Sequence, residues 1–486
     1  MNAFDYFFEK TSNLEKFFLV GKDNLSFKEL YSSSLHLASW LRKEFGSNKN
    51  ILLLSVNNRF FLKAYFAIIK SGNVCIPLDP NIEKENLEYI SGLTKPVMIF
   101  MTRDIEQKIT ASAVKCIFPD TIGKDEFKGP LTEKEENFDG KACAEIIFTS
   151  GSTGIPKGVM ISHKNLIANT DSIITYLKLN QDDRMLVVLP FYYCYGLSLL
   201  HTHLRVGGSI VFNNSFIFLG SIINNLLDYK CTGFAGVPSH FQILLRKSDN
   251  FKTTKFPDLK YVTQAGGKLA PIFIDEFKSS HPEIIFIVMY GQTEATARLS
   301  YLPPELYEVK KGSMGKGIPG VELKVINEKG EKIKPGEIGE VIACGDNIML
   351  GYFGDEEGTR NTIRNGWLHT GDLGTVDNDG YIFLTARKKE IIKVGGKRIS
   401  PKEIEAVILE LPEVIDCTIE GVEDELLGEA LKATIVIRAE NGKETMLAMI
   451  KQHCSRHLAL YKVPRIFELK EQLVISATGK KIKGKL

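Results

Sequence analysis

The feature that most constrains the fold is an alternation of short apolar runs and helix-like segments through the first 290 residues of this 486-residue chain. Helical periodicity marks residues 60–70, 216–229 and 271–278. Gly72 terminates the first of these segments. The apolar runs are typical of buried strands and cover residues 51–56, 97–101, 146–149, 185–189, 233–237, 261–264 and 284–289. Buried strands that alternate with helices predict parallel sheets covered by helices on both faces.

The pattern changes after Pro319. Residues 322–326 alternate in polarity, residues 328–330 form a turn, and residues 339–344 are another short strand. Short alternating strands joined by tight turns predict a small antiparallel β unit. We place it at about residues 320–386, within a large domain of layered, mostly parallel sheets at residues 1–386.

A third pattern begins near Arg387. Ser400-Pro401-Lys402-Glu403 matches a capping box with proline at the first helical position, which predicts a helix over residues 401–411. Two strands and a second helix follow, at residues 415–419, 431–437 and 444–458. The α/β chain is therefore predicted to end in a small α+β domain at residues 387–486.

Composition excludes several classes of function. A formal net charge of +2 leaves no excess of basic residues to neutralise many phosphates, which argues against a nucleic-acid binder. No run of 18 apolar residues predicts a membrane span. The eight cysteines are dispersed without zinc-type spacing, and the N-terminus has acids where a signal peptide has bases. We therefore expect a cytoplasmic protein.

The most informative segment runs from the strand at residues 146–149 into a loop that ends at Gly158. It holds three glycines, four hydroxyl side chains and one lysine, groups that suit close contact with phosphate. Pro156 stands where a Walker A loop needs its last glycine, which disfavours a P-loop NTPase. A flexible Ser/Gly turn is the alternative. The preceding buried strand favours phosphate binding by Thr149, Ser150, Gly151, Ser152, Thr153, Gly154 and Lys157.

This loop resembles the signature of the AMP-forming acyl-CoA synthetase, adenylation-domain and luciferase superfamily. Leu25-Ser26-Phe27-Lys28-Glu29-Leu30 and Leu78-Asp79-Pro80 resemble early motifs of that superfamily, and the resemblance runs nearly end to end. It implies that ATP, with Mg²⁺, activates a carboxylic acid as its acyl-AMP, and that the acyl group then passes to the thiol of CoA.

The motif Tyr290-Gly291-Gln292-Thr293-Glu294 follows the strand at residues 284–289, and ligands collect at the carboxyl ends of parallel strands. An aromatic ring can stack on a base, a hydroxyl can bind phosphate, and a carboxylate can hold Mg²⁺. The resemblance makes Tyr290 the adenine partner, Thr293 a phosphate ligand and Glu294 the metal ligand. It also makes Gly266-Gly267-Lys268 the lining of the adenine site. Alone, the motif fits any strand-to-loop turn.

Asp372 lies in a segment, residues 367–374, that resembles the next block of the superfamily. An ionised carboxylate has enough lone pairs to accept from both ribose hydroxyls. The resemblance makes Arg387 the second ribose contact. A turn aspartate and a surface arginine are the alternatives.

Residues 387–400 resemble the hinge block, about which the small domain of the superfamily rotates. The resemblance makes Lys389 the pivot, and Gly395 and Gly396 a lining of the thiol tunnel. By composition the segment is a solvated basic run, which remains our interpretation of its other basic residues, Lys388, Lys397 and Arg398.

Lys480, in Thr478-Gly479-Lys480, resembles the C-terminal catalytic lysine of the superfamily. An ammonium between the attacking carboxylate and the α-phosphate would offset their repulsion. The usual upstream proline and downstream arginine are replaced by Val474 and Lys483, so a disordered basic tail is the competing interpretation.

Residues 190–197 follow a strand and resemble the block that shapes the acyl pocket, which we expect to be lined by Tyr193, Tyr195, Gly196 and Val237. Cys194 is expected to pack rather than react. No acid occurs between Pro190 and Gly208, which disfavours an α-amino acid substrate.

The acceptor is left open between CoA and the phosphopantetheine of an acyl or peptidyl carrier protein. A degenerate nucleotide-binding protein is disfavoured because Thr293, Glu294, Asp372 and Lys480 are all present.

Overall fold

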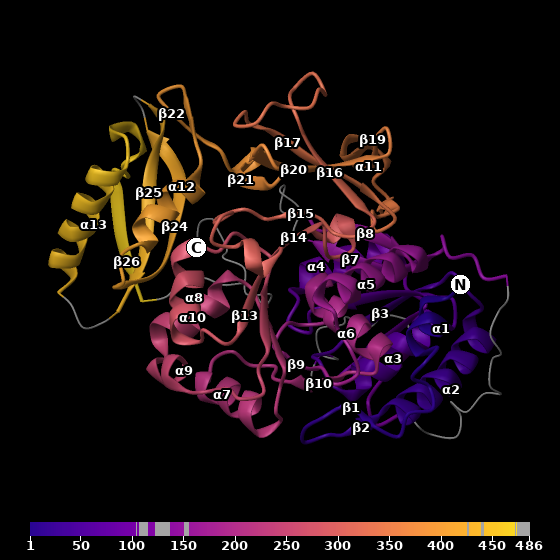
Figure 1. Ribbon diagram of the computed structural model, residues 1–486. Helices are drawn as coiled ribbons and strands as arrows, with labels where there is room; N and C mark the ends of the chain where they lie inside the picture. The colour runs from indigo at the N-terminus through magenta and orange to yellow at the C-terminus, as the bar shows by residue number, and fades with distance from the viewer. Residues whose placement is uncertain are drawn as a thin grey trace.

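The computed structural model describes residues 1–103, 105, 115–121, 137–149, 155–424, 427–438, 442–471 and 473. Residues 150–154 of the predicted phosphate loop and the predicted catalytic Lys480 lie outside the described residues. The described part folds into two large sheets with helices, a smaller β unit and a C-terminal α+β unit (Figure 1). The α/β fold class predicted from the alternation of strands and helices is confirmed.

The first large sheet has the strand order β18-β8-β7-β4-β3-β5-β6 in the described residues. The five strands from β7 to β6 are parallel, whereas β8 and β18 join antiparallel at one edge. The strands are β3 (Asn50–Leu54), β4 (Val74–Leu78), β5 (Met98–Met101), β6 (Lys115–Ile117), β7 (Cys143–Thr149), β8 (Lys157–Ser162) and β18 (Gly351–Tyr352).

The second large sheet has the order β15-β14-β13-β12-β11-β9-β10-β1-β2 over the same described ranges. Its centre, from β13 to β1, is parallel. Its strands are β1 (Phe17–Leu19), β2 (Leu25–Ser26), β9 (Arg184–Val187), β10 (Ser209–Phe212), β11 (Gly233–Gly236), β12 (Tyr261–Gln264), β13 (Ile285–Tyr290), β14 (Ser300–Leu302) and β15 (Lys316–Gly317). The functional motif at Tyr290 therefore stands at the carboxyl end of a parallel strand, as predicted.

Helices form three layers around these sheets. The strand β3 contacts helices on both of its faces. Ile51 and Leu53 belong to an apolar core with the helices between the two sheets, whereas Leu52 and Leu54 belong to a second core with α4. The inner helices are α1 (Ala3–Phe8), α3 (Arg59–Lys70), α5 (His163–Leu177) and α6 (Cys194–Val206), with α2 (Phe27–Phe45) against α3. The outer helices are α4 (Lys84–Thr94) on the first sheet and α7 (Leu219–Asp228), α8 (Pro238–Lys247), α9 (Asp249–Thr253) and α10 (Pro271–Ser280) by the second.

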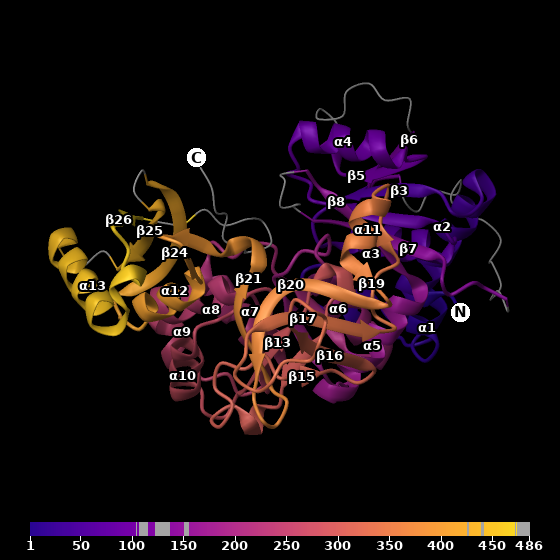
Figure 2. The same ribbon diagram turned by 90° about the horizontal axis from the view of Figure 1, so that it is seen from above.

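The smaller β unit is antiparallel, and its strands β20 and β21 lie between the first sheet and the C-terminal unit in both views (Figures 1 and 2). Its elements are β16 (Val321–Ile326), β17 (Gly339–Gly345), α11 (Glu356–Thr362), β19 (Ile363–Arg364), β20 (Trp367–Val376) and β21 (Ile382–Arg387). This placement puts the carboxyl end of β21 at the start of the C-terminal unit.

The C-terminal unit packs on α8 of the large domain. Arg246 of α8 forms an ion pair with Glu276 and donates from Nη1 to the backbone oxygens of Leu411 and Val414, each at 2.9 Å. The unit contains β22 (Ile392–Val394), β23 (Lys397–Ile399), α12 (Pro401–Leu409), β24 (Val414–Asp424), β25 (Gly428–Ile437), α13 (Lys443–His457) and β26 (Ile466–Lys470). One buried arginine thus couples the two parts of the chain.

The capping box predicted at Ser400 is wrong, although the helix is present. The Ser400 hydroxyl donates to the backbone oxygen of Thr385 at 2.6 Å, so it ties α12 to β21 and does not cap the helix. The helix ends at Leu409, two residues before the predicted end. Similarly, α7 begins at Leu219, three residues after the predicted start at Phe216, whose ring stacks on His240 with 4.1 Å between the ring centroids.

Candidate functional site

Tyr290, Asp372 and Arg387 meet at the centre of the candidate site. Tyr290 ends β13, and antiparallel pairing of β20 with β21 sets Asp372 opposite Arg387. Tyr290 Oη donates to Asp372 Oδ2 at 2.6 Å, and Arg387 Nε donates to Asp372 Oδ1 at 2.8 Å. One distant segment and two neighbouring strands therefore share one buried carboxylate, because Tyr290 lies 82 residues and Arg387 only 15 residues from Asp372, which is 5% exposed.

The electrostatics keep Tyr290 and Arg387 as hydrogen-bond donors to Asp372. Burial and the neighbouring Asp372 hold the pKa of Tyr290 well above its usual range, so its hydroxyl stays a donor. The charge of Asp372 raises the pKa of Arg387. Each carboxylate oxygen of Asp372 accepts one hydrogen bond here and retains a further lone pair, so the group can still accept from two vicinal hydroxyls.

Thr293 and Glu294 lie on the short 3-10 helix η3 (Thr293–Ala295), which Gln292 precedes. The Thr293 hydroxyl is buried and lies 3.5 Å from the Sγ of Cys194 at the start of α6. Glu294 Oε1 accepts from the hydroxyl of Tyr352 at 2.8 Å. The carboxylate is thus oriented by a neighbour and keeps lone pairs with which it can bind a cation.

Lys157 and Thr149 face each other across the β7–β8 ladder, at the two ends of the phosphate loop. Lys157 Nζ forms an ion pair with Asp355 Oδ2 at 2.7 Å and lies 4.8 Å from the centroid of the Tyr352 ring. Asp355 also caps α11, and the hydrogen bond from Lys157 is the main cause of its lowered pKa.

Tyr352 and Asp355 were missed by the sequence reasoning. Tyr352 contacts both Lys157 and Glu294, so it joins the loop lysine to the candidate metal ligand. The available signal was Gly351-Tyr352-Phe353-Gly354-Asp355, in which two glycines flank an aromatic pair within the β-rich segment.

The glycines of the site have local structural reasons. Gly266 has a φ of +82°, where a side chain would be strained. A Cβ on Gly291 would overlap with the backbone oxygen of Ala297, so only glycine fits after Tyr290. Gln264 Nε2 donates to the backbone oxygen of Gly267 at 2.8 Å, which shapes the turn after β12.

Lys268 reaches from this turn to the small β unit. Its Nζ donates to the backbone oxygen of Leu384 at 3.0 Å. Burial, and then the charge of Lys402, lower its pKa. Lys268 therefore links the predicted adenine segment to β21, which carries Arg387.

The residues predicted to line the acyl pocket are buried together around α6. The rings of Tyr193 and Tyr195 pack edge to face, with 6.4 Å between their centroids, and Val237 is fully buried. Gly196 packs against Pro190, whose backbone oxygen an added Cβ would overlap. Close packing thus accounts for the glycine independently of a pocket.

A buried arginine, Arg298, was also missed. It is 3% exposed, and its Cζ lies 3.9 Å from the centroid of the Tyr195 ring. The signal was a single cation in Ala295-Thr296-Ala297-Arg298-Leu299, directly after Glu294. Sequence reasoning did not use it.

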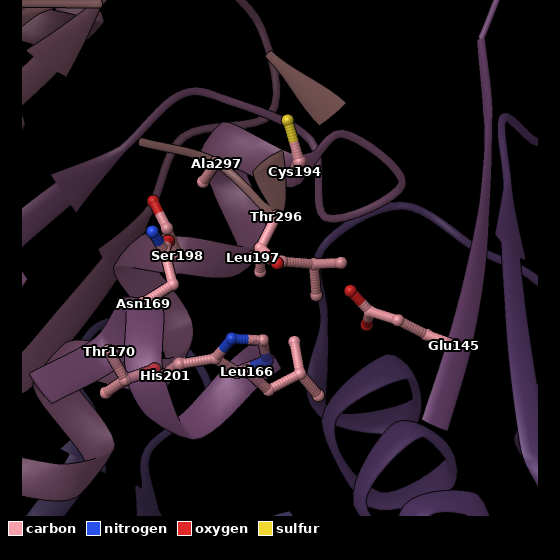
Figure 3. Close-up of a pocket in the computed structure, with 10 residues that line it drawn as sticks. All are labelled: Glu145, Leu166, Asn169, Thr170, Cys194, Leu197, Ser198, His201, Thr296 and Ala297. Atoms are coloured by element: carbon pink, nitrogen blue, oxygen red, sulfur yellow. The ribbon is translucent and has the colours of Figure 1, made fainter. Parts of the chain in front are cut away.

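A small cavity lies beside α6, and its volume of about 10 Å³ corresponds to about one water molecule (Figure 3). The Glu145 carboxylate of β7 and the His201 ring of α6 point toward it, and Cys194 lies on its rim. Tyr65 Oη donates to Glu145 Oε2 at 2.8 Å and lies 2.7 Å from His201 Nε2. Burial raises the pKa of Glu145 to about 7 and lowers that of His201 to about 3. This network was not anticipated.

The predicted hinge and tunnel residues lie at the start of the C-terminal unit. Lys389 is the middle residue of the 3-10 helix η5 (Lys388–Glu390). Gly395 and Gly396 join β22 to β23 with φ values of +53° and +78°. Two consecutive positive φ angles are what a two-residue hairpin turn requires, so the turn itself demands this glycine pair.

Among the described residues, no helix is long and apolar enough to cross a membrane.

Comparisons with known proteins bear on this arrangement. The family model described as AMP-binding enzyme matches residues 7–353, and the model described as AMP-binding enzyme C-terminal domain matches residues 403–480. The second match extends to the position of Lys480.

Individual relatives match over almost their whole length. An oxalate–CoA ligase from Arabidopsis thaliana is 30% identical, and the match covers 95% of this chain and 92% of the relative. A feruloyl-CoA synthase from Amycolatopsis sp is 28% identical, and the match covers 96% of this chain and 94% of the relative. The o-succinylbenzoate CoA synthetase of Bacillus subtilis, solved with its acyl-adenylate, has a TM-score of 0.86 and 25% identity over 100% of this chain and 99% of its own. Its complex with ATP and magnesium has a TM-score of 0.85 and 25% identity over 99% and 98%.

Proposed function

The chain belongs to the AMP-binding enzyme family, and from that premise we propose that it is an AMP-forming acid–thiol ligase. It activates a carboxylic acid as acyl-AMP, releases pyrophosphate, and transfers the acyl group to the thiol of CoA. The observation that carries the proposal is the convergence of Tyr290, Asp372 and Arg387 on one buried carboxylate beside η3.

We assign nucleoside recognition to this convergence. The ring of Tyr290 stacks on adenine, and the glycine-rich turn Gly266-Gly267-Lys268 with Gly291 and Gln292 lines the base. Asp372 accepts from the ribose hydroxyls, with Arg387 as the second ribose contact. Support comes from the fixed orientation of Asp372, whose two oxygens are held by different donors while lone pairs remain.

Phosphate and magnesium recognition falls to the neighbouring residues. Thr293, Thr149, Lys157 and the loop residues 150–154 bind the phosphates, and Glu294 binds the Mg²⁺ that accompanies ATP. Within the described ranges, no group of three or more His, Cys, Asp or Glu side chains could hold a metal ion. That fits Mg²⁺, which one carboxylate can hold when substrate phosphates complete its coordination.

In the first half-reaction, the substrate carboxylate oxygen attacks the α-phosphorus in line, the bond to the β-phosphate oxygen breaks, and pyrophosphate leaves with the electron pair. Negative charge accumulates on the α-phosphate, so a cation placed there stabilises the transition state. We assign this role to Lys480 in the C-terminal unit. Lys157 offsets charge on the phosphates from the other side once its ion pair with Asp355 opens.

In the second half-reaction, the thiol loses its proton to solvent, sulfur attacks the acyl carbon, the bond from the acyl carbon to the phosphate oxygen breaks, and AMP leaves with the electron pair. We propose that residues 387–486 rotate as a lid about Lys389 on the large domain of residues 1–386, so that Gly395 and Gly396 face the thiol. The short connection at η5 supports a pivot there, and rotation would have to break the contacts of Arg246 with Leu411 and Val414.

The relatives are named for different carboxylic acid substrates, so their names do not identify the acid that this chain activates. The absence of an acidic residue between Pro190 and Gly208 disfavours an α-amino acid. All eight cysteines of the chain lie in the described part, and none of them forms a disulfide there. This supports a cytoplasmic location, because thiols persist in a reducing compartment.

The proposal is tested by ATP–pyrophosphate exchange with a panel of carboxylic acids, followed by thioester formation with free CoA or a holo-carrier protein. We expect exchange with at least one acid and thioester formation with CoA. Turnover only with the carrier would move the acceptor to carrier phosphopantetheine, and failure of exchange with every acid would refute the ligase.

Two lysines test the catalytic assignment. Lys480→Ala should lower exchange by about 10²- to 10³-fold, the usual loss on removal of one transition-state donor, whereas Lys481→Ala serves as the matched control. Lys389→Pro should preserve exchange and reduce thioester formation, with Lys389→Ala as the control for the side chain. Equal loss of both half-reactions would exclude Lys389 as the pivot.

A further inference from the structure

Arg298 is a buried cation placed directly behind the proposed phosphate-binding residues. It is the third residue after the end of η3 and is 3% exposed. Its backbone oxygen accepts from Asn347 Nδ2 at 2.7 Å, which fixes the chain at this point. The position of the guanidinium is therefore set by the same turn that sets Thr293 and Glu294.

The guanidinium lacks the neutralisation that burial ordinarily requires. Its Nη1 donates to the backbone oxygen of Ala297 at 3.2 Å, but its buried Nε has no hydrogen-bond partner in the described structure. No carboxylate of the described residues lies within ion-pair distance. A buried charge is costly unless it is paired, and a guanidinium has five N–H donors to satisfy.

Arg246 shows how this fold neutralises a buried arginine whose role is structural. It is 4% exposed, nearly as buried as Arg298. It forms an ion pair with Glu276 and donates to two backbone oxygens at 2.9 Å. Arg298 has only aromatic surroundings in place of a carboxylate, which points to a ligand as its counter-ion.

The surroundings of Arg298 are the residues assigned to the acyl pocket. Its Cζ lies 3.9 Å from the centroid of the Tyr195 ring, and the hydroxyls of Tyr195 and Tyr176 also interact with the guanidinium, although neither carries a charge that would neutralise it. Cys194, the neighbour of Tyr195, contacts the Thr293 hydroxyl at 3.5 Å. The cation therefore lies among the residues assigned to the acyl pocket and close to the proposed phosphate-binding residues.

We propose that Arg298 determines specificity by binding a second carboxylate of the acid substrate, so that the preferred substrate is a dicarboxylic acid with a short spacer. This inference rests on the proposed ligase function. One carboxylate attacks the α-phosphorus, and the other supplies the missing counter-ion at the guanidinium, whose fork of donors matches a carboxylate. Burial strengthens this contact because little water competes for either group.

Matched substrate pairs test the proposal. Each dicarboxylic acid from succinate to pimelate is compared with its monoamide, which has nearly the same size and lacks the second charge. The readout is the ratio of kcat/KM for diacid over monoamide in ATP–pyrophosphate exchange, since a general loss of activity cancels in the ratio. We expect the wild type to favour one diacid by about 10- to 100-fold, as for a charged hydrogen-bonded contact.

Arg298→Leu should bring this ratio to about 1, and Arg298→Lys should retain part of the preference. Arg364 is exposed, so Arg364→Leu should leave the ratio unchanged. The wild-type ratios stand on their own if Arg298→Leu does not fold. Exchange with monocarboxylic acids and no diacid preference would overturn the role of Arg298 alone. The same preference in Arg298→Leu would also overturn it, whereas no exchange with any acid would overturn the ligase as well.

Discussion

The hydrogen bond between Tyr290 and Asp372 should be measurable as a coupling energy, because both partners are buried and the acceptor is charged. The two groups are 2.6 Å apart, and a hydrogen bond to an ionised partner contributes about 1.5–3 kcal/mol. Tyr290→Phe should therefore lower the free energy of unfolding by about 1.5–3 kcal/mol.

Asp372→Ala should cost slightly more. It leaves the buried Tyr290 hydroxyl without its acceptor, at about 1–3 kcal/mol, and removes the ion pair with Arg387. The Arg387 side chain is 55% exposed, so solvent screening limits that ion pair to about 1 kcal/mol or less. We expect a total of about 1–4 kcal/mol.

The double variant Tyr290→Phe/Asp372→Ala should be about as stable as Asp372→Ala, which gives a coupling energy of about 1.5–3 kcal/mol. Denaturant unfolding followed by tryptophan fluorescence is suitable, because Trp367 lies on the same strand as Asp372. Tyr301→Phe is the matched control. Its effect on the free energy of unfolding should add to that of Asp372→Ala within about 0.5 kcal/mol. Simple additivity of Tyr290→Phe and Asp372→Ala would refute the shared-carboxylate geometry. The same Asp372→Ala variant should also lower kcat/KM for ATP by about 10- to 100-fold if Asp372 binds the ribose.

Burial raises the pKa of Glu145 from 4.5 to about 7, so its stabilising contribution is full below 4.5 and is lost as the pH rises toward 7. In urea unfolding, the free energy of unfolding of Glu145→Gln should therefore rise relative to that of the wild type by about 1.4 kcal/mol per pH unit within that window. A difference between the two proteins that does not change with pH would contradict a buried proton on Glu145. Tyr352→Phe should raise the Mg²⁺ concentration for half-maximal exchange several-fold, because Glu294 loses the donor that orients it, and an unchanged Mg²⁺ titration would exclude this role. Arg246→Gln weakens the contact with Val414 that holds the C-terminal unit on α8, so trypsin should cut the basic segment after β21 faster than in the wild type. Equal cleavage rates would show that other contacts hold the unit.

Periodicity predicted the sheets well because it reports burial directly. The strand that ends at Tyr290 was predicted from an apolar run, and the rule that ligands collect at the carboxyl ends of parallel strands then placed Thr293 and Glu294. Element ends were less accurate where tertiary contacts decided them, as when Ser400 bonded to Thr385 and did not cap α12. The roles assigned to the site residues stay predictions, and residues 150–154 and Lys480 lie outside the described residues as well.

The meeting of Asp372 with Arg387 depends on the register of β20 and β21, which a local pattern does not encode. The superfamily resemblance suggested both residues for one ribose, and the structure brings them to 2.8 Å. Tyr352 illustrates the opposite case. Its neighbours Lys157 and Glu294 come from other strands and turns, so no spacing within its own segment could reveal the contact.

Buried charge is the property that sequence reasoning reaches least well, and the two arginines show why. Arg246 follows two leucines and Arg298 stands between alanine and leucine, so both segments predict a similar apolar environment. The difference lies in a partner thirty positions away, since Glu276 meets Arg246, whereas no carboxylate in the described structure meets Arg298. Whether a buried cation stabilises the fold or awaits an anionic ligand is therefore decided by tertiary neutralisation, and at Arg298 that missing neutralisation coincides with the residues that we propose line the acyl pocket.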